Sequence, residues 1–313
     1  MKKTLVAVAA VAAVTGAMAD VTIYGTVDEH VVSTKTTKTT TSMSGAYSGN
    51  ALGFKGSEDL SGGMKANFQV EFNPNWHGAS STQTVTNYQS FAGLSGDFGS
   101  LRAGQFFSQQ FFNNALGDAT GRSNAGGFTA VSEGATGVNQ NNNIEYTLPS
   151  IVSGLGIIVA RTFDNGAYDT TTNDGSNTVS SSTYRLTYST GALNVGYASS
   201  KANTATAGAM SSKSTSTSAN YDLGVAKLFA NYQTYLTTTT ATNMGISIPF
   251  GAAALNANYG YKSVSGTKTY GYIWQGTYAF SKRTTGIIQY APTGTVSGAT
   301  TTTTTTVGVQ HNF

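Results

Sequence analysis

The feature that most constrains the fold of this chain is an alternation of large apolar residues with small or polar ones. It is clearest in the stretch YGYIWQGTYAF, Tyr270 to Phe280. Because successive side chains of a β-strand point to opposite faces of a sheet, this spacing predicts a strand with one large apolar face. Periodicity alone leaves open whether that face meets a protein core or a lipid bilayer. The large side chains are those of Tyr270, Tyr272, Trp274, Tyr278 and Phe280.

The same alternation recurs along the chain, for example in residues 64–72, 143–148, 183–188, 227–232 and 255–262. Short connections alternate with longer polar ones, which we expect at residues 33–45, 73–84, 106–138, 164–182 and 201–215. This order predicts an up-and-down antiparallel meander of sixteen strands. An even number of strands brings both ends of the meander to one side, so the last strand can pair with the first and remove the sheet edges.

Strand length and loop asymmetry indicate which solvent the apolar face meets. A soluble sandwich buries its apolar faces between two sheets and needs neither such regular ~10-residue strands nor such small polar faces. Outer-membrane barrels combine ~10-residue strands, short periplasmic turns, long outer loops and aromatic residues bordering an outward apolar band. The sequence therefore predicts an all-β fold, a transmembrane 16-stranded antiparallel β-barrel, with the five aromatic residues of 270–280 facing lipid. Charged residues predicted to line a wet lumen are Asp28, Glu71, Arg185, Lys227 and Lys262.

The amino-terminal residues predict export. Lys2 and Lys3, the apolar run from Thr4 to Val14 and the small residues 17–19 match a secretory signal peptide. The apolar run is shorter than the ~20 residues that a membrane-spanning helix needs. We therefore expect residues 1–19 to be a signal peptide and residues 20–313 to be one outer-membrane barrel domain.

Composition excludes several classes of protein and site. The 17 Lys and Arg include Lys2 and Lys3, so residues 20–313 carry 15 basic against 14 acidic side chains, which argues against nucleic-acid binding by bulk charge. The absence of cysteine excludes disulfides and thiolate metal sites. We expect no cofactor. Asp164, Asp169 and Asp174 crowd one loop, and both a weak calcium site and a solvated loop remain open.

Catalysis is not expected. The chain has three histidines: His30, which we place near the outer rim of the first strand; His77, in a polar loop; and His311, on the lipid-facing side of the last strand. None lies in a recognisable nucleophile motif, and no G-x-S-x-G sequence occurs. A structural or adhesive barrel with a plugged lumen is the alternative to a pore. A plug requires bulky lumen residues, whereas the polar faces here are mostly small.

Several stretches together resemble the Gram-negative general porins, in the branch common among β-proteobacteria. They are VTIYGTVD (Val21 to Asp28), GFKGSEDLSGGMKANFQVEF (Gly53 to Phe72), GLSGDFGSLRAGQ (Gly93 to Gln105), YDLGVAKLFANY (Tyr221 to Tyr232), FSKRT (Phe280 to Thr284) and the closing VGVQHNF. The carboxyl-terminal Phe313 is similar to the residue that the outer-membrane assembly machinery reads in such proteins. The resemblance implies a homotrimer in the bacterial outer membrane, in contact with lipid and lipopolysaccharide, that passes small hydrophilic solutes and ions.

The resemblance also implies a constriction. In the family the third loop folds into the barrel, and its acids face bases on the wall; here that loop corresponds to residues 106–138. The residues it assigns to the constriction are Asp118, Glu133 and Arg122 on the loop and Lys55, Lys65 and Arg102 on the wall. Family members commonly have arginine where this chain has Ala51, Tyr88 and Gln105. We therefore expect weak charge selectivity.

Overall fold

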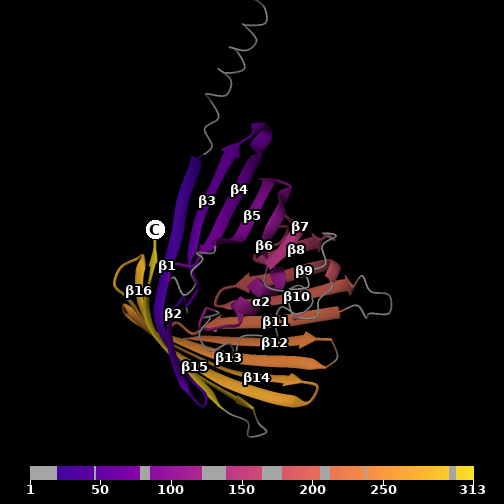
Figure 1. Cartoon of the computed structure of the whole chain (residues 1–313). Coiled ribbons are helices and arrows are strands. Elements are labelled where there is room, and N and C mark those ends of the chain that lie inside the picture. The colour runs from indigo at the N-terminus through magenta and orange to yellow at the C-terminus, as the bar shows by residue number, and fades with distance from the viewer. Residues whose placement is uncertain are drawn as a thin grey trace, which may run out of the picture.

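The structure, a computed structural model, describes residues 20–45, 47–77, 85–121, 139–163, 178–204, 212–236, 238–295 and 301–313. These residues form one antiparallel sheet that closes on itself (Figure 1). The strands are β1 (Asp20–Lys35), β2 (Thr39–Ser44), β3 (Ala51–Asp59), β4 (Lys65–Pro74), β5 (Val85–Gly96), β6 (Gly99–Phe107), β7 (Asn139–Thr147), β8 (Leu155–Thr162), β9 (Thr178–Thr190), β10 (Leu193–Thr204), β11 (Ser212–Asp222), β12 (Lys227–Tyr235), β13 (Thr239–Phe250), β14 (Ala253–Val264), β15 (Thr267–Ala279), β16 (Thr284–Thr295) and β17 (Thr302–Asn312).

Closure joins the two ends of the chain. β1 pairs with β17 from Thr26, opposite Asn312, to Lys35, opposite Thr303. Beyond this ladder, the backbone N–H of Phe313 donates to the carbonyl of Gly25 at 3.0 Å. Every strand except β2, which pairs with β1 alone, has a neighbour on each side, so the sheet closes into a barrel.

Two strands share one position of the barrel. β2 pairs with residues 30–35 of β1, and β3 pairs with residues 20–26. The two strands therefore follow each other along the same edge of β1 and together fill one strand position. The segment Gly45–Asn50 interrupts them. The 17 described strands therefore occupy sixteen positions, and the predicted closed 16-stranded antiparallel barrel is confirmed.

The predicted polar connection at residues 33–45 is wrong. β1 continues to Lys35, and after a tight reversal at residues 36–38 the chain returns as β2. Threonine dominates this stretch. Its branched Cβ favours extended backbone, so a run that reads as polar loop extends the hairpin instead.

The two faces of the sheet differ as the alternation predicts. On β15, the side chains of Trp274 and Tyr278 are each 51% exposed on the outside, whereas Ile273 is 1% exposed on the inside. Tyr272 and Phe280 are also exposed, and Tyr270 is half-buried. The barrel thus presents a large apolar outer face and a smaller, mostly polar inner face.

The described residues also contain two helices. The 3₁₀ helix η1 (Ser61–Gly63) forms the short turn between β3 and β4. The α-helix α2 (Gln109–Leu116) follows β6 and lies inside the barrel (Figure 1). No helix among the described residues is long and apolar enough to cross a membrane.

Candidate pore lining and constriction

The chain that follows β6 turns into the barrel instead of crossing its rim. Ser108 caps α2, because its side-chain oxygen accepts a hydrogen bond from the backbone N–H of Phe111 at 3.1 Å. The helix ends at Gly117 and contacts the inner side of β9, β10, β11 and β12. We call residues Ser108–Gly121 the inner segment. It is the described part of the loop predicted at 106–138, and the remainder lies outside the described residues.

Amide side chains attach the helix to the wall. The Nδ2 group of Asn113 donates to the carbonyl oxygen of Ser216 at 3.0 Å and to its Oγ at 2.5 Å. Asn220 donates from its own Nδ2 to the carbonyl of Leu116 at 2.9 Å. These wall residues are buried because the helix covers them. Part of the polar inner face therefore holds protein and does not face an open lumen.

The residues after the helix continue along the wall in the same way. Asn243 donates to the carbonyl of Gly117 at 3.0 Å. Asn258 donates to Oδ1 of Asp118 at 2.5 Å, and Gln275 donates to the carbonyl of Thr120 at 3.4 Å. Asp118 is consequently 6% exposed. The structure thus places this predicted constriction acid against β14 in an amide contact.

An ion pair anchors the start of the inner segment. Nη2 of Arg102 lies 2.8 Å from Oε1 of Glu145 on β7, and the guanidinium covers the ring of Phe106 at 4.0 Å from its centroid. Gln109 donates to Oε2 of the same glutamate at 2.6 Å, and Arg185 donates to Oε1 of Gln109 at 3.4 Å. This cluster connects β6, β7 and β9 to the first turn of α2.

Sequence reasoning selected the two arginines of this cluster but missed Glu145 and Gln109. Alternation had already put Glu145 on the polar face. Its pairing with Arg102 depends on the register between β6 and β7, which shifts between Gly104 and Phe106. A register shift of this kind leaves no signal in the alternation of either strand.

A second group of buried polar contacts lies at the break between β2 and β3. The carboxylate of Asp28 on β1 accepts backbone N–H groups from Tyr47, Ser48 and Gly49 at 3.0, 2.8 and 2.8 Å. Its other oxygen lies 2.7 Å from Nε2 of His30. Both side chains of this pair are fully buried. The expectation that His30 lies near the outer rim is wrong, because β1 extends five residues past it.

These contacts hold residues 47–50 on the inner side of β1. Asn50 accepts the backbone N–H of Asp28 at 2.7 Å, and Gln310 of β17 donates to the hydroxyl of Ser48. The hydroxyl of Tyr47 lies 3.5 Å from the point where a Cβ at Gly121 would sit. The interrupted strand and the described end of the inner segment therefore meet inside the barrel.

Glu71 is likewise occupied by donors. Tyr24 donates to its Oε2 at 2.6 Å and Gln89 donates to its Oε1 at 3.2 Å. Lys55, on the neighbouring strand β3, is exposed on the inner face, and its Nζ lies 4.9 Å from the ring centroid of Tyr24. The predicted wall base is therefore accessible, whereas the predicted lumen acid beside it is buried.

The other predicted basic residues lie nearer the ends of the barrel. Lys65 begins β4 beside the short turn and forms an exposed pair with Asp59 at 2.8 Å. Lys227 begins β12 beside another short turn, and Lys262 lies at the long-loop end of β14. None of these three lysines forms an ion pair with an acid of the inner segment among the described residues. Arg122 and Glu133 lie outside the described residues, as do Asp164, Asp169 and Asp174.

Four acids inside the barrel are thus buried, whereas Lys55 and Arg102 are more accessible. The carboxylates of Asp28, Glu71, Asp118 and Glu145 are all 7% exposed or less, and each accepts hydrogen bonds from fixed donors. Such donors offset part of each negative charge at the lumen surface. The described residues contain no group of three or more histidines, cysteines and acids that could hold a metal ion.

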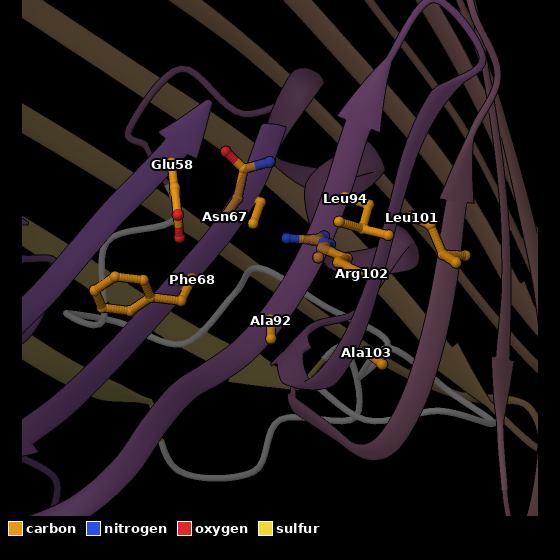
Figure 2. A pocket seen from close by; sticks show the side chains of 10 residues that line it. Glu58, Asn67, Phe68, Ala92, Leu94, Leu101, Arg102 and Ala103 are labelled. Atoms are coloured by element: carbon orange, nitrogen blue, oxygen red, sulfur yellow. The ribbon is translucent and has the colours of Figure 1, made fainter. Parts of the chain in front are cut away.

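A groove of about 600 Å³ lies on the opposite, outer side of the wall, over β4, β5 and β6 (Figure 2). Small side chains form its floor, among them Ala92 and Ala103, and larger ones such as Phe68, Leu94 and Leu101 form its rim. Their parity puts these side chains on the lipid side. The groove is therefore part of the apolar outer surface.

Comparisons with known proteins agree with this architecture. The major outer membrane proteins P.IB of Neisseria meningitidis and Neisseria gonorrhoeae are 41% and 42% identical over 116 and 119 residues. Each match spans about a third of this chain and about a third of the relative. The anion-selective porin from Comamonas acidovorans has the same fold, with a TM-score of 0.78 at 22% identity over 95% of this chain and all of that one.

A Salmonella typhi OmpF structure also has this fold, with a TM-score of 0.72 at 15% identity over 95% of this chain and all of that one. A sequence profile described as Gram-negative porin matches residues 6–297, which is nearly the whole chain. The chain therefore belongs to the Gram-negative porin family and is a multi-pass β-barrel of the bacterial outer membrane.

Proposed function

We propose that this protein is a general diffusion porin, a water-filled channel for ions and small hydrophilic solutes without catalysis or energy coupling. The observation that carries the proposal is the closed barrel with an apolar outside and a polar inside, in which the inner segment follows the wall. A segment fixed along the wall narrows a lumen and leaves the rest of its cross-section to water. The wall excludes lipid, and the narrowing sets the size limit for solutes.

Single-channel recording in a planar bilayer tests the proposal against a plugged structural or adhesive barrel. We expect discrete, long-lived conductance steps from the purified protein. A protein that inserts, as shown by protection from protease, but gives no steps would contradict the proposal and favour the plug. The attachment of Asn113 and Asp118 to the wall supports the open channel, because a plug needs contacts that cross the lumen.

We further propose that charge selectivity is weak and that it favours small anions. Lys55 is exposed on the inner wall and Arg102 is 24% exposed, whereas the carboxylates of Asp28, Glu71 and Asp118 are buried among donors. Arg122 and Glu133 complete the set of charges proposed to act at the constriction. The name of the Comamonas porin states anion selectivity, and its 22% identity carries only the fold to this chain.

The reversal potential under a tenfold potassium chloride gradient measures this selectivity. We expect a permeability ratio of chloride to potassium between about 1 and 5, which corresponds to less than about 1 kcal/mol of discrimination. Lys55→Gln should move the ratio toward unity, because it removes an exposed lumen cation. Strong selectivity of either sign would contradict the proposal.

We propose that the protein is exported by the signal at residues 1–19, inserted by the outer-membrane assembly machinery through Phe313, and assembled as a homotrimer.

Small residues at the floor of the outer groove, such as Ala92 and Ala103, leave room for side chains of an adjacent subunit. Chemical cross-linking in detergent should give a trimer that Ala92→Trp weakens. A monomer at all protein concentrations would contradict the assembly. Phospholipid and lipopolysaccharide are the proposed surroundings.

A further inference from the structure

A row of cations crosses the outer face of the barrel at the long-loop end of β8 to β11. Arg161 of β8 pairs in register with Ser182 of β9. Ser182 pairs with Lys201 of β10, and Lys201 pairs with Lys213 of β11. Residues directly opposite each other in antiparallel strands share a face. We call Arg161, Lys201 and Lys213 the cation row.

The cation row lies outside the barrel and just beyond Tyr184 and Tyr197, which we take to belong to an aromatic belt. Ser182 shares the parity of Tyr184, which is exposed on the outer face. The ring of Tyr184 lies 6.0 Å from that of Tyr197, and both rings are closer to the middle of the barrel than the cation row. Aromatic belts mark the boundary between acyl chains and headgroups. The cation row therefore lies at headgroup depth, in the leaflet on the long-loop side.

The charges of this row are not balanced by the described part of the protein. Lys201 and Lys213 are both exposed and directly opposite each other, an arrangement that like charges make unfavourable. None of the ion pairs formed by the described residues includes a member of the cation row. An anion between the strands would remove this repulsion.

Two hydrogen bonds fix the guanidinium of Arg161 in an orientation that can bind such an anion. Nη1 of Arg161 donates to the hydroxyl of Ser182 at 2.7 Å and Nη2 donates to the hydroxyl of Ser180 at 2.9 Å. These bonds orient the guanidinium, which has five N–H groups, and leave others of them without a partner among the residues that the structure describes. A fixed guanidinium beside two lysines is a good match for the oxygens of a phosphate.

We propose that the cation row binds the phosphate groups of a phosphorylated glycolipid in the outer leaflet. Neighbouring strands lie ~4.8 Å apart, so Arg161 and Lys213, three strands apart, span roughly 14 Å. That distance suits a headgroup with more than one phosphate, whose acyl chains follow the apolar wall below the aromatic belt. The proposal names the site of the lipid contact proposed above and depends on membrane placement, not on conduction.

Native mass spectrometry of the full-length protein in detergent, titrated with diphosphorylated lipid A, tests this site. The variant R161Q/K201Q/K213Q is expected to bind on the order of 100-fold more weakly, at about fivefold for each cation near an anionic lipid. The matched control is K282Q/R283Q, which removes exposed cations from a short turn at the opposite end. It should bind as the wild type does. Both variants should conduct normally, so the result is separate from the pore proposal.

Two further titrations identify the ligand. Dephosphorylated lipid A should bind weakly to the wild type, and inorganic phosphate should not compete with lipid A at equal concentration. Equal binding of both lipids, competition by inorganic phosphate, or wild-type affinity in the triple variant would each overturn the proposal. The proposal would also be overturned if the triple variant bound lipid A as the wild type does but had a lower melting temperature in the absence of lipid. That result would mean that the cations stabilise the protein's own loops.

Discussion

Asp28→Ala is expected to lower the free energy of unfolding by roughly 3–5 kcal/mol, because three backbone N–H groups and His30 lose a buried acceptor. The released residues 47–50 should also move away from the inner segment. Single-channel current should then become larger or noisier than in the wild type. Urea unfolding in lipid vesicles, followed by tryptophan fluorescence, measures the first effect, and planar bilayers measure the second.

Asp59→Ala is the matched control for this substitution. Asp59 pairs with Lys65 at 2.8 Å, but both side chains are more than half exposed. Exposed ion pairs contribute about 0–1 kcal/mol, so the control should change stability little and conductance not at all. Equal effects of the two substitutions would show that the buried contacts of Asp28 do not hold the interrupted strand in place.

Glu145→Gln is expected to cost about 3 kcal/mol and to loosen the start of the inner segment. The substitution keeps the volume of the side chain but leaves the guanidinium of Arg102 without its carboxylate. The cost should fall at the low end for a broken buried pair, because Arg102 is 24% exposed to the lumen. Longer or more frequent conductance substates should accompany the loss of stability.

A double-mutant cycle with Arg102→Met separates the ion pair from the rest of the cluster. If the two side chains act as a pair, the double variant should be more stable than the sum of the single losses predicts, by about 1 kcal/mol or more. Additive losses would mean that Glu145 acts mainly through Gln109. Lys227→Gln serves as a lumen-charge control outside the cluster of Arg102 and Glu145, and we expect no change in substates from it.

The barrel itself could be predicted because alternation reports the faces of a strand directly. The sequence around Trp274 assigned the outer face correctly, since most side chains there are large or small according to their parity; Ile273 and Gly276 are the exceptions. The run of threonines at residues 33–45 misled the prediction, because threonine suits both polar loops and strands. Its place in the hairpin of β1 and β2 depends on pairing with a neighbour, which composition does not report.

The inner face could be predicted less well, because its contacts connect residues that are distant in sequence. Parity placed Asp28 on the lumen side, but its role as an acceptor for residues 47–49 depends on the break between β2 and β3. Asp118 was expected to face the lumen, and the structure shows that it lies against Asn258. Contacts of this kind depend on where a loop settles on the wall, and no local sequence pattern encodes that.

The most direct test of the central claim uses the absence of cysteine from the chain. Lys55→Cys places a thiol on the inner face, and Met244→Cys places one on the outer face, where Met244 is 60% exposed. In a planar bilayer, a charged, membrane-impermeant thiol reagent should react with the first and change the single-channel current in discrete steps. The second should stay unreactive. Reaction at residue 244 without reaction at residue 55 would contradict a polar, water-filled interior inside an apolar, lipid-facing wall.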